Sequence, residues 1–290
     1  SEGRSLFAMQ YMLLTKLTDG LEDPLKLSDF ICFPSQNDQA PMQIAWGRMN
    51  DRGGTTRLEE IPSLGFGNDG FYAPIMYSKD WTPYSGIKMW VDPSGRGQDK
   101  TGYCVTAYAL GKIHILALGG LEGGYSTDTL HELAAVAKQC AVREIFVEDN
   151  FGQGMFVELF RPVLARLFTP EWGASIDTVR VSGQKELRLI AALEPPLNQH
   201  RICIPPEIAA NEELQRQLTR LTRQRNCLKH DDEVEALAMC VKQWEDVLAV
   251  DPDLGAQRRR QQQKMEELDE HYRAMGLAAN PKPRWFQHTK

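Results

Sequence analysis

The stretch from residue 86 to residue 121 most constrains the fold, because three strand-like apolar runs follow one another there with almost no room between them. The runs cover residues 86–92, 101–110 and 112–118. The tight turn Leu110-Gly111-Lys112 joins the last two runs, which is typical of a hairpin connection. The sequence therefore predicts a meander of three strands.

Helical and strand-like segments alternate after the meander. Ser126 or Thr127 can cap a helix that carries its apolar residues on one face. The further segments are strand 143–148, helix 155–168, strand 178–181, helix 184–193, strand 201–204, and helices 206–223 and 231–249. A meander followed by alternating helices and strands predicts an α/β fold, with a mixed sheet and helices on both of its faces.

The remaining segments flank this region. Residues 1–85 contain one stretch with helical spacing, SLFAMQYMLLTKL, and then short apolar pieces separated by turn residues, so we expect an N-terminal extension. Residues 86–250 form the predicted main domain. Residues 251–290 are a charged tail with one narrow apolar stripe and a Trp285-Phe286 pair, a composition that suits a segment that orders on a partner.

Composition excludes several classes of protein. The six cysteines form no C-x-x-C pair, so neither a zinc site nor a disulfide framework is indicated, and a reducing cytoplasm fits best. No run of 18 apolar residues exists, so we expect no membrane partner. The net charge of −6 is unlike that of most DNA-binding domains. Any DNA site must therefore be a local basic patch on an acidic body.

Acidic residues stand at three places where the chain would bring them together. Asp92 ends the first strand, and Glu148 ends the strand after the first helix. If these strands are parallel neighbours, both acids lie at carboxyl ends of strands, where open α/β sheets place their sites. Asp232 lies on the apolar stripe of the helix 231–249, whereas Asp231 can cap that helix. Each acid alone is more often a turn or cap residue, but the three together favour a metal site.

Three carboxylates at one sheet edge would repel each other without a cation. Two Mg²⁺ or Mn²⁺ ions, about 3.5–4 Å apart, would neutralise them, activate a water and stabilise the leaving 3′ oxygen of a phosphodiester. Ligands that are all oxygen atoms favour these ions over zinc.

Four motifs together resemble the nuclease domain of phage terminase large subunits, of the DNA maturase type found in short-tailed podoviruses. They are VDPSGRGQDKTG, FVEDNFGQGMF, VSGQKELRLIAALEPPLNQHRI and LKHDDEVEALA. The resemblance implies a ribonuclease H-like fold and an endonuclease whose three acids bind two divalent metals and cut concatemeric double-stranded DNA. It assigns Asp92, Glu148 and Asp232 to the metals, with Asp231 as the alternative third acid. Asp99, after the glycine turn, could support a metal or only shape the turn.

The resemblance also names partners and a setting. It implies double-stranded DNA, the terminase small subunit and the prohead portal as partners, with the tail docking on the portal, in the host cell cytoplasm. Large subunits of this family carry a packaging ATPase, but the chain has no G-x-x-x-x-G-K-[ST] motif. We therefore expect the nuclease half alone, with residues 1–85 as the linker from an ATPase domain.

Three further hypotheses stay open. Lys185 and Arg188 share one predicted helix face and could hold DNA phosphates, although a solvated face is the commoner explanation. An actin-like or sugar-kinase type ATP-binding domain is the rival fold, because it also begins with a meander, an acid and a glycine-rich turn. A non-catalytic module that docks on DNA or the portal is the third alternative.

Overall fold

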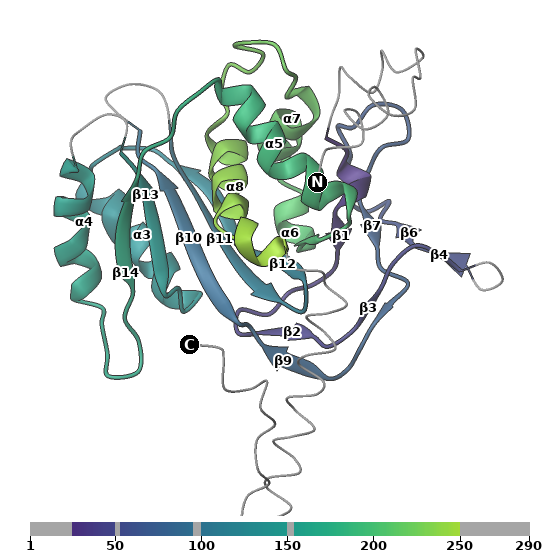
Figure 1. The fold of residues 1–290 in the computed structure, drawn as a ribbon, viewed down its shortest axis with the longest axis horizontal. Helices are drawn as coiled ribbons and strands as arrows, with labels where there is room; N and C mark the ends of the chain where they lie inside the picture. Colours follow the sequence, from purple (N-terminus) through teal and green to yellow (C-terminus); the bar gives the residue numbers. More distant parts are fainter. Residues whose placement is uncertain (1–24, 50–52, 95–99, 150–153, 250–290) are drawn as a thin grey trace, which may run out of the picture.

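The fold is built on a nine-stranded mixed sheet with the strand order β14-β13-β10-β11-β12-β15-β1-β7-β6. The structure is a computed structural model that describes residues 25–49, 53–94, 100–149 and 154–249 (Figure 1). Three of its strands are the predicted meander: β10 (Gly86–Asp92), β11 (Thr101–Ala109) and β12 (Lys112–Leu121) pair antiparallel in chain order. The prediction of a meander is confirmed.

The strands that follow join the meander on both sides. On one side, β13 (Glu144–Glu148) pairs parallel with β10, and β14 (Ser175–Val179) pairs parallel with β13 at the sheet edge. On the other side, β15 (Ile202–Ile204) pairs parallel with β12. The predicted strand 178–181 begins earlier than expected, because the register pairs Ile176 with Ile145.

Helices cover the sheet in two groups. They are α3 (Thr127–Gln139), α4 (Met155–Ala165), α5 (Lys185–Asn198), α6 (Pro206–Ala209), α7 (Glu212–Arg220), α8 (Asp232–Lys242) and α9 (Glu245–Leu248). The expected single helix 206–223 is two helices, because Asn211 caps α7 by accepting hydrogen bonds from the backbone N–H groups of Glu213 and Leu214. The expected helix 231–249 is likewise divided, at Gln243 and Trp244, into α8 and α9.

Each face of the sheet has its own core. Trp90 of β10 belongs to a cluster that includes residues of α5, α7 and α8. Its neighbours Met89 and Val91 point the other way, into a cluster with residues of α3 and α4. This alternation follows from the period of two along a strand, and it confirms the α/β prediction of a mixed sheet with helices on both faces.

Residues 25–85 add to the same sheet. Within them, β1 (Ile31–Cys32) pairs parallel with β15 and with β7 (Tyr72–Ala73), and β6 (Thr56–Arg57) completes the edge. The smaller elements are η1 (Leu27–Asp29), β2 (Gln39–Pro41), β3 (Ile44–Ala45), β4 (Arg48–Met49), β5 (Gly53–Gly54), β8 (Met76–Tyr77) and β9 (Trp81–Pro83). Phe30 and Phe71 are buried in the core of the α5–α8 face. The turn-rich sequence of this stretch predicts an N-terminal extension but gives no sign of these short pairings.

The division into domains at residues 85 and 250 stays a prediction. The expected helix SLFAMQYMLLTKL and the tail from residue 251 lie outside the described residues. None of the described helices combines the length and the apolar character that a membrane span needs.

Candidate metal centre

Two neighbouring strands bring Asp92 and Glu148 together. In the parallel pair of β10 and β13, Val91 is the partner of Val147, and each strand ends one residue later. Asp92 and Glu148 therefore end adjacent strands at the same edge of the sheet. Both have the parity of Trp90, so they face the side of the sheet that α8 covers.

A third carboxylate reaches this edge from α8. Single carboxylate oxygens of Asp92, Glu148 and Glu235 all lie within 4.8 Å of one another. The Glu235 side chain is only 3% exposed, whereas Asp92 and Glu148 are half-buried. We call these three residues the carboxylate cluster.

A glycine lets α8 approach so closely. Gly102 of β11 is the cross-strand partner of Asp92. A Cβ atom on Gly102 would lie 2.4 Å from the backbone oxygen of Asp232, which is too close for any other residue without movement of the helix. The first turn of α8 thus lies directly on β11, next to the carboxylate of β10.

Two cations of α5 hold the acids of α8. Lys185 forms ion pairs with Asp231, at 2.9 Å, and with Glu235. Arg188 reaches the other oxygen of Glu235, with 2.6 Å between Nη2 and Oε1. Both oxygens of Glu235 therefore already have a cationic partner. Lys185 and Arg188 are thus paired with acids of the chain itself. Their contact with DNA stays a prediction.

The environment favours protonation of the two strand acids. Burial raises the pKa of Asp92 well above its usual range, and the charges of Glu235, Glu148 and Asp232 raise it further. Burial, followed by the charge of Glu235, raises the pKa of Glu148 to about 7, although Arg188 and Lys185 oppose the shift. Burial alone would lower the pKa of Lys185, but Glu235 and Asp231 raise it above its usual value. Burial and neighbouring negative charge therefore both favour the protonated forms of Asp92 and Glu148.

The predicted acids have different contacts in the structure. Asp92 and Glu148 meet as expected. Asp232 is outside the group of three, yet it is near enough to raise the pKa of Asp92. Asp231 does not cap α8 with its side chain but accepts the hydrogen bond from Lys185. Asp99 lies outside the described residues.

Glu235 is the residue that the sequence analysis missed. A signal for it was present, because Glu235 stands one turn after Asp231 and Asp232 within the otherwise apolar run VEALAMCV. A charged residue surrounded by buried neighbours on a helix needs partners. Here the partners are Lys185 and Arg188.

Asp149, the residue after Glu148, has a structural role. Its Oδ1 accepts a hydrogen bond of 2.9 Å from the backbone N–H of Gly154, which adopts a left-handed conformation just before α4. Asp149 therefore links the end of β13 to the residue that precedes α4.

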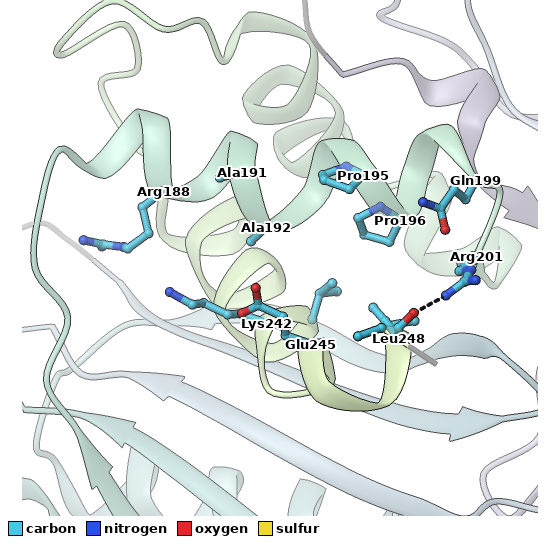
Figure 2. A pocket seen from close by; sticks show the side chains of 12 residues that line it. Arg188, Ala191, Ala192, Pro195, Pro196, Gln199, Arg201, Lys242, Glu245 and Leu248 are labelled. Carbon is cyan, nitrogen blue, oxygen red and sulfur yellow. Dashed lines mark hydrogen bonds between the residues drawn. The ribbon is translucent and has the colours of Figure 1, made fainter. Parts of the chain in front are cut away.

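One of the described cavities lies between α5 and the C-terminal helices. This cavity of about 350 Å³ separates α5 from α8 and α9 (Figure 2). Pro195, Pro196 and Leu248 supply apolar lining, and Arg201 donates to the carbonyl of Leu248 at 2.6 Å. Arg188 lines one end of the cavity and also forms the ion pair with Glu235 of the carboxylate cluster.

Comparisons with known proteins point to one family. The family model described as Terminase Bacteriophage T7, Ribonuclease H-like domain matches residues 91–202. The terminase large subunit of Enterobacteria phage T3 is 34% identical over 257 residues, which cover 83% of this chain and 42% of that protein. The chain thus spans less than half of the length of this relative.

Solved structures of terminase nucleases are also similar. The large terminase nuclease from thermophilic phage G20c is 14% identical, with 75% of this chain and 95% of that chain covered and a TM-score of 0.43. The human cytomegalovirus terminase nuclease domain, in a structure soaked with Mn and bound to an inhibitor, is 16% identical, with 57% and 86% covered and a TM-score of 0.42.

The family assignment rests on the matched model and the T3 relative, and it agrees with the resemblance of the four sequence motifs. The chain belongs to the family of phage terminase large subunits and carries their ribonuclease H-like nuclease domain.

Proposed function

We propose that the chain is a metal-dependent endonuclease that cuts concatemeric double-stranded phage DNA during genome packaging. The observation that carries the proposal is the convergence of Asp92, Glu148 and Glu235 at the carboxyl ends of two parallel strands. Family membership supports the reaction class, because the matched domain is the nuclease domain of terminases. The sugar-kinase alternative has no such support.

The donor set fits divalent cations. Carboxylate oxygens are ligands that Mg²⁺ and Mn²⁺ prefer. Burial, and after it the neighbouring carboxylates, raise the pKa of Asp92 and of Glu148, and a bound cation would favour their ionised forms. Two such ions, when bound, would supply an activated water and charge stabilisation at the leaving oxygen of the phosphodiester.

Asp92 and Glu148 are the proposed principal ligands, and Asp232 is the proposed third. The support for Asp232 is its position. Its backbone lies against Gly102, which is the cross-strand partner of Asp92, and its charge contributes to the raised pKa of Asp92. Lys185 and Arg188 pair with Glu235, and Lys185 also contacts Asp231.

The role of Glu235 is then to position the site. It fixes Lys185 and Arg188 against α8, and so fixes the start of α5 beside the strand ends. This arrangement keeps two cations at the border of the site, where they limit repulsion among the carboxylates. We also propose that both cations approach a phosphate of bound DNA.

The wider assembly is part of the same proposal. In the complete motor, the nuclease would act with an ATPase domain, the terminase small subunit and the prohead portal, in the host cytoplasm. The T3 relative is more than twice as long as the aligned region, which leaves room for a further domain.

Cleavage of supercoiled plasmid tests the proposal. The parent chain should nick and linearise the plasmid with Mn²⁺ or Mg²⁺ and should be inactive in EDTA. Asp92→Asn should lower the rate about a thousandfold, because loss of a metal ligand removes several kcal/mol of transition-state stabilisation.

Asp149→Ala is the matched control, because Asp149 is adjacent to Glu148 but is outside the carboxylate cluster and contacts Gly154 and Arg180. It should stay within about tenfold of the parent rate, since loss of one such hydrogen bond costs about 1 kcal/mol. Equal rates for the parent and Asp92→Asn would refute the metal centre. A parent that hydrolyses ATP and leaves DNA intact would favour the kinase alternative.

A further inference from the structure

We propose that the segment that joins α7 to α8 is the surface that holds the DNA phosphates next to the carboxylate cluster. We call residues 220–230 the basic loop; Figure 1 shows it at the top of the view, leading into α8. The inference rests on the proposed nuclease function, because it assigns to that site a surface for its substrate.

The charge of the basic loop is opposite to that of the whole chain. Residues 220–230 read RLTRQRNCLKH, with four Arg and Lys residues and no Asp or Glu, whereas the chain as a whole has a net charge of −6. Arg220, Arg225 and Lys229 are exposed, and none of the three forms an ion pair within the described part of the chain. This is the local basic patch that an acidic DNA-binding protein requires.

The basic loop is held in a defined position. The buried carboxylate of Glu186 accepts a hydrogen bond of 2.6 Å from the backbone N–H of Asn226, a residue in the left-handed region with φ 55°. Gln184 donates to the carbonyl of Arg223 at 3.0 Å, and the Arg223 side chain pairs with Glu194 at 3.1 Å.

These contacts leave the exposed cations uncompensated. The two acids of α5 nearest to the basic loop, Glu186 and Glu194, are both buried and are bound to its backbone and to Arg223. Asp231, which follows the loop, is paired with Lys185. The charges of Arg220, Arg225 and Lys229 therefore remain available for an external anion.

The position of the loop identifies that anion. The first turn of α5 binds the basic loop through Glu186 and the acids of α8 through Lys185, so the two surfaces are adjacent. Three separate cations at the border of a nuclease site match the repeated phosphates of a DNA backbone. Contacts of this kind need charge but no base recognition, so they tolerate any sequence.

Salt-dependent DNA binding tests the inference. The association constant of the full chain for a short fluorescent duplex is measured by anisotropy, over a series of NaCl concentrations in EDTA, where no cleavage occurs. Arg220→Ala/Arg225→Ala/Lys229→Ala should weaken binding at low salt by about tenfold or more. It should also reduce the slope of log K against log[NaCl] by about 2 to 3, since each phosphate contact contributes about 0.9.

Two matched variants control for net charge and for geometry. Lys79→Ala/Lys138→Ala/Arg166→Ala removes three other exposed cations, and it should keep nearly the parent slope. Arg220→Lys/Arg225→Lys/Lys229→Arg keeps the charges and should also keep the slope. Thermal unfolding of each variant checks that the fold is intact.

The outcomes separate this inference from the proposed function. Equal slopes for the parent and the alanine variant of the loop, or the same loss in the Lys79/Lys138/Arg166 variant, would overturn the assignment of the basic loop. A parent chain that fails to bind the duplex would also overturn it. Asp92→Asn should bind DNA with the parent slope, so a fault in the metal centre would appear in cleavage and not in binding.

Discussion

The carboxylate cluster and the cavity of Figure 2 lie at α5 and α8, yet they differ in nearly every property. The cluster is crowded and charged, and burial raises the pKa values of Asp92 and Glu148 there. The cavity has a volume of about 350 Å³. It is lined largely by alanine, proline and aliphatic side chains together with a few charged ones. We infer from the contrast that converging charge at strand ends, and not the size of a hollow, marks the proposed site.

Among the changes compared below, substitutions of the acids of α8 should have the largest effect on cleavage. Asp232→Asn should lower plasmid cleavage by about a hundredfold or more, because a metal ligand would be lost. Glu235→Gln should lower cleavage by only about tenfold, but it should lower the melting temperature more, because Lys185 and Arg188 lose their buried partner. If Glu235→Gln instead loses more cleavage than Asp232→Asn and keeps the higher melting temperature, Glu235 is the third ligand.

Displacing α8 without touching a carboxylate tests whether close approach matters. In Gly102→Ala, the new Cβ would meet the backbone oxygen of Asp232 at 2.4 Å, so the helix must move away. We expect a loss of about 1–3 kcal/mol in the free energy of unfolding, measured with urea, together with reduced cleavage.

Gly86→Ala is the matched control for this change. Its Cβ would meet only the ring edge of Trp244, at 3.2 Å, and Gly86 lies at the opposite end of β10 from Asp92. Cleavage by Gly86→Ala should stay near the parent rate. Similar activity in the Gly102 variant and the parent would show that the distance between α8 and β11 does not govern the site.

The pH dependence of stability should report on Glu148. Its pKa rises from an ordinary value of 4.5 to about 7 in the fold, so folding favours its protonated form. Its contribution to stability is therefore present below pH 4.5 and is lost as the pH rises through about 7.

In EDTA, the melting temperature of the parent should fall between pH 5 and pH 8, and that of Glu148→Gln should fall less. Asp149→Gln provides the comparison at the neighbouring position. The same pH profile for the parent and the Glu148 variant would contradict the raised pKa.

The cavity should give the smallest effect. Lys242→Ala removes an exposed cation from its lining. We expect the free energy of unfolding to change by less than about 0.5 kcal/mol and the cleavage rate to stay at the parent value. A marked loss of cleavage in this variant would mean that the two regions are coupled, with Arg188 as the connection.

The long strands and the two acids that end them were predictable, because their signals are local. An apolar run of period two, closed by an acid and a turn, is visible in β10 and β13 without knowledge of the fold. The parallel pairing of these strands then follows from the helix between them.

What escaped prediction depends on contacts between distant segments. The short strand β1 has two residues and is held by pairing with β7 and with β15, which lies about 170 positions later in the chain. Glu235 joins the cluster because Gly102 admits α8 and because α5 supplies the cations. Neither Gly102 nor the cations of α5 can be assigned to Glu235 from the segment 231–242 alone.

Anomalous diffraction from crystals of the chain soaked in Mn²⁺ tests the central claim most directly. The account predicts a Mn²⁺ peak bound by carboxylate oxygens of both Asp92 and Glu148, and no peak in crystals of Asp92→Asn soaked in the same way. Mn²⁺ that orders elsewhere and leaves both of these carboxylates without a metal contact would contradict it.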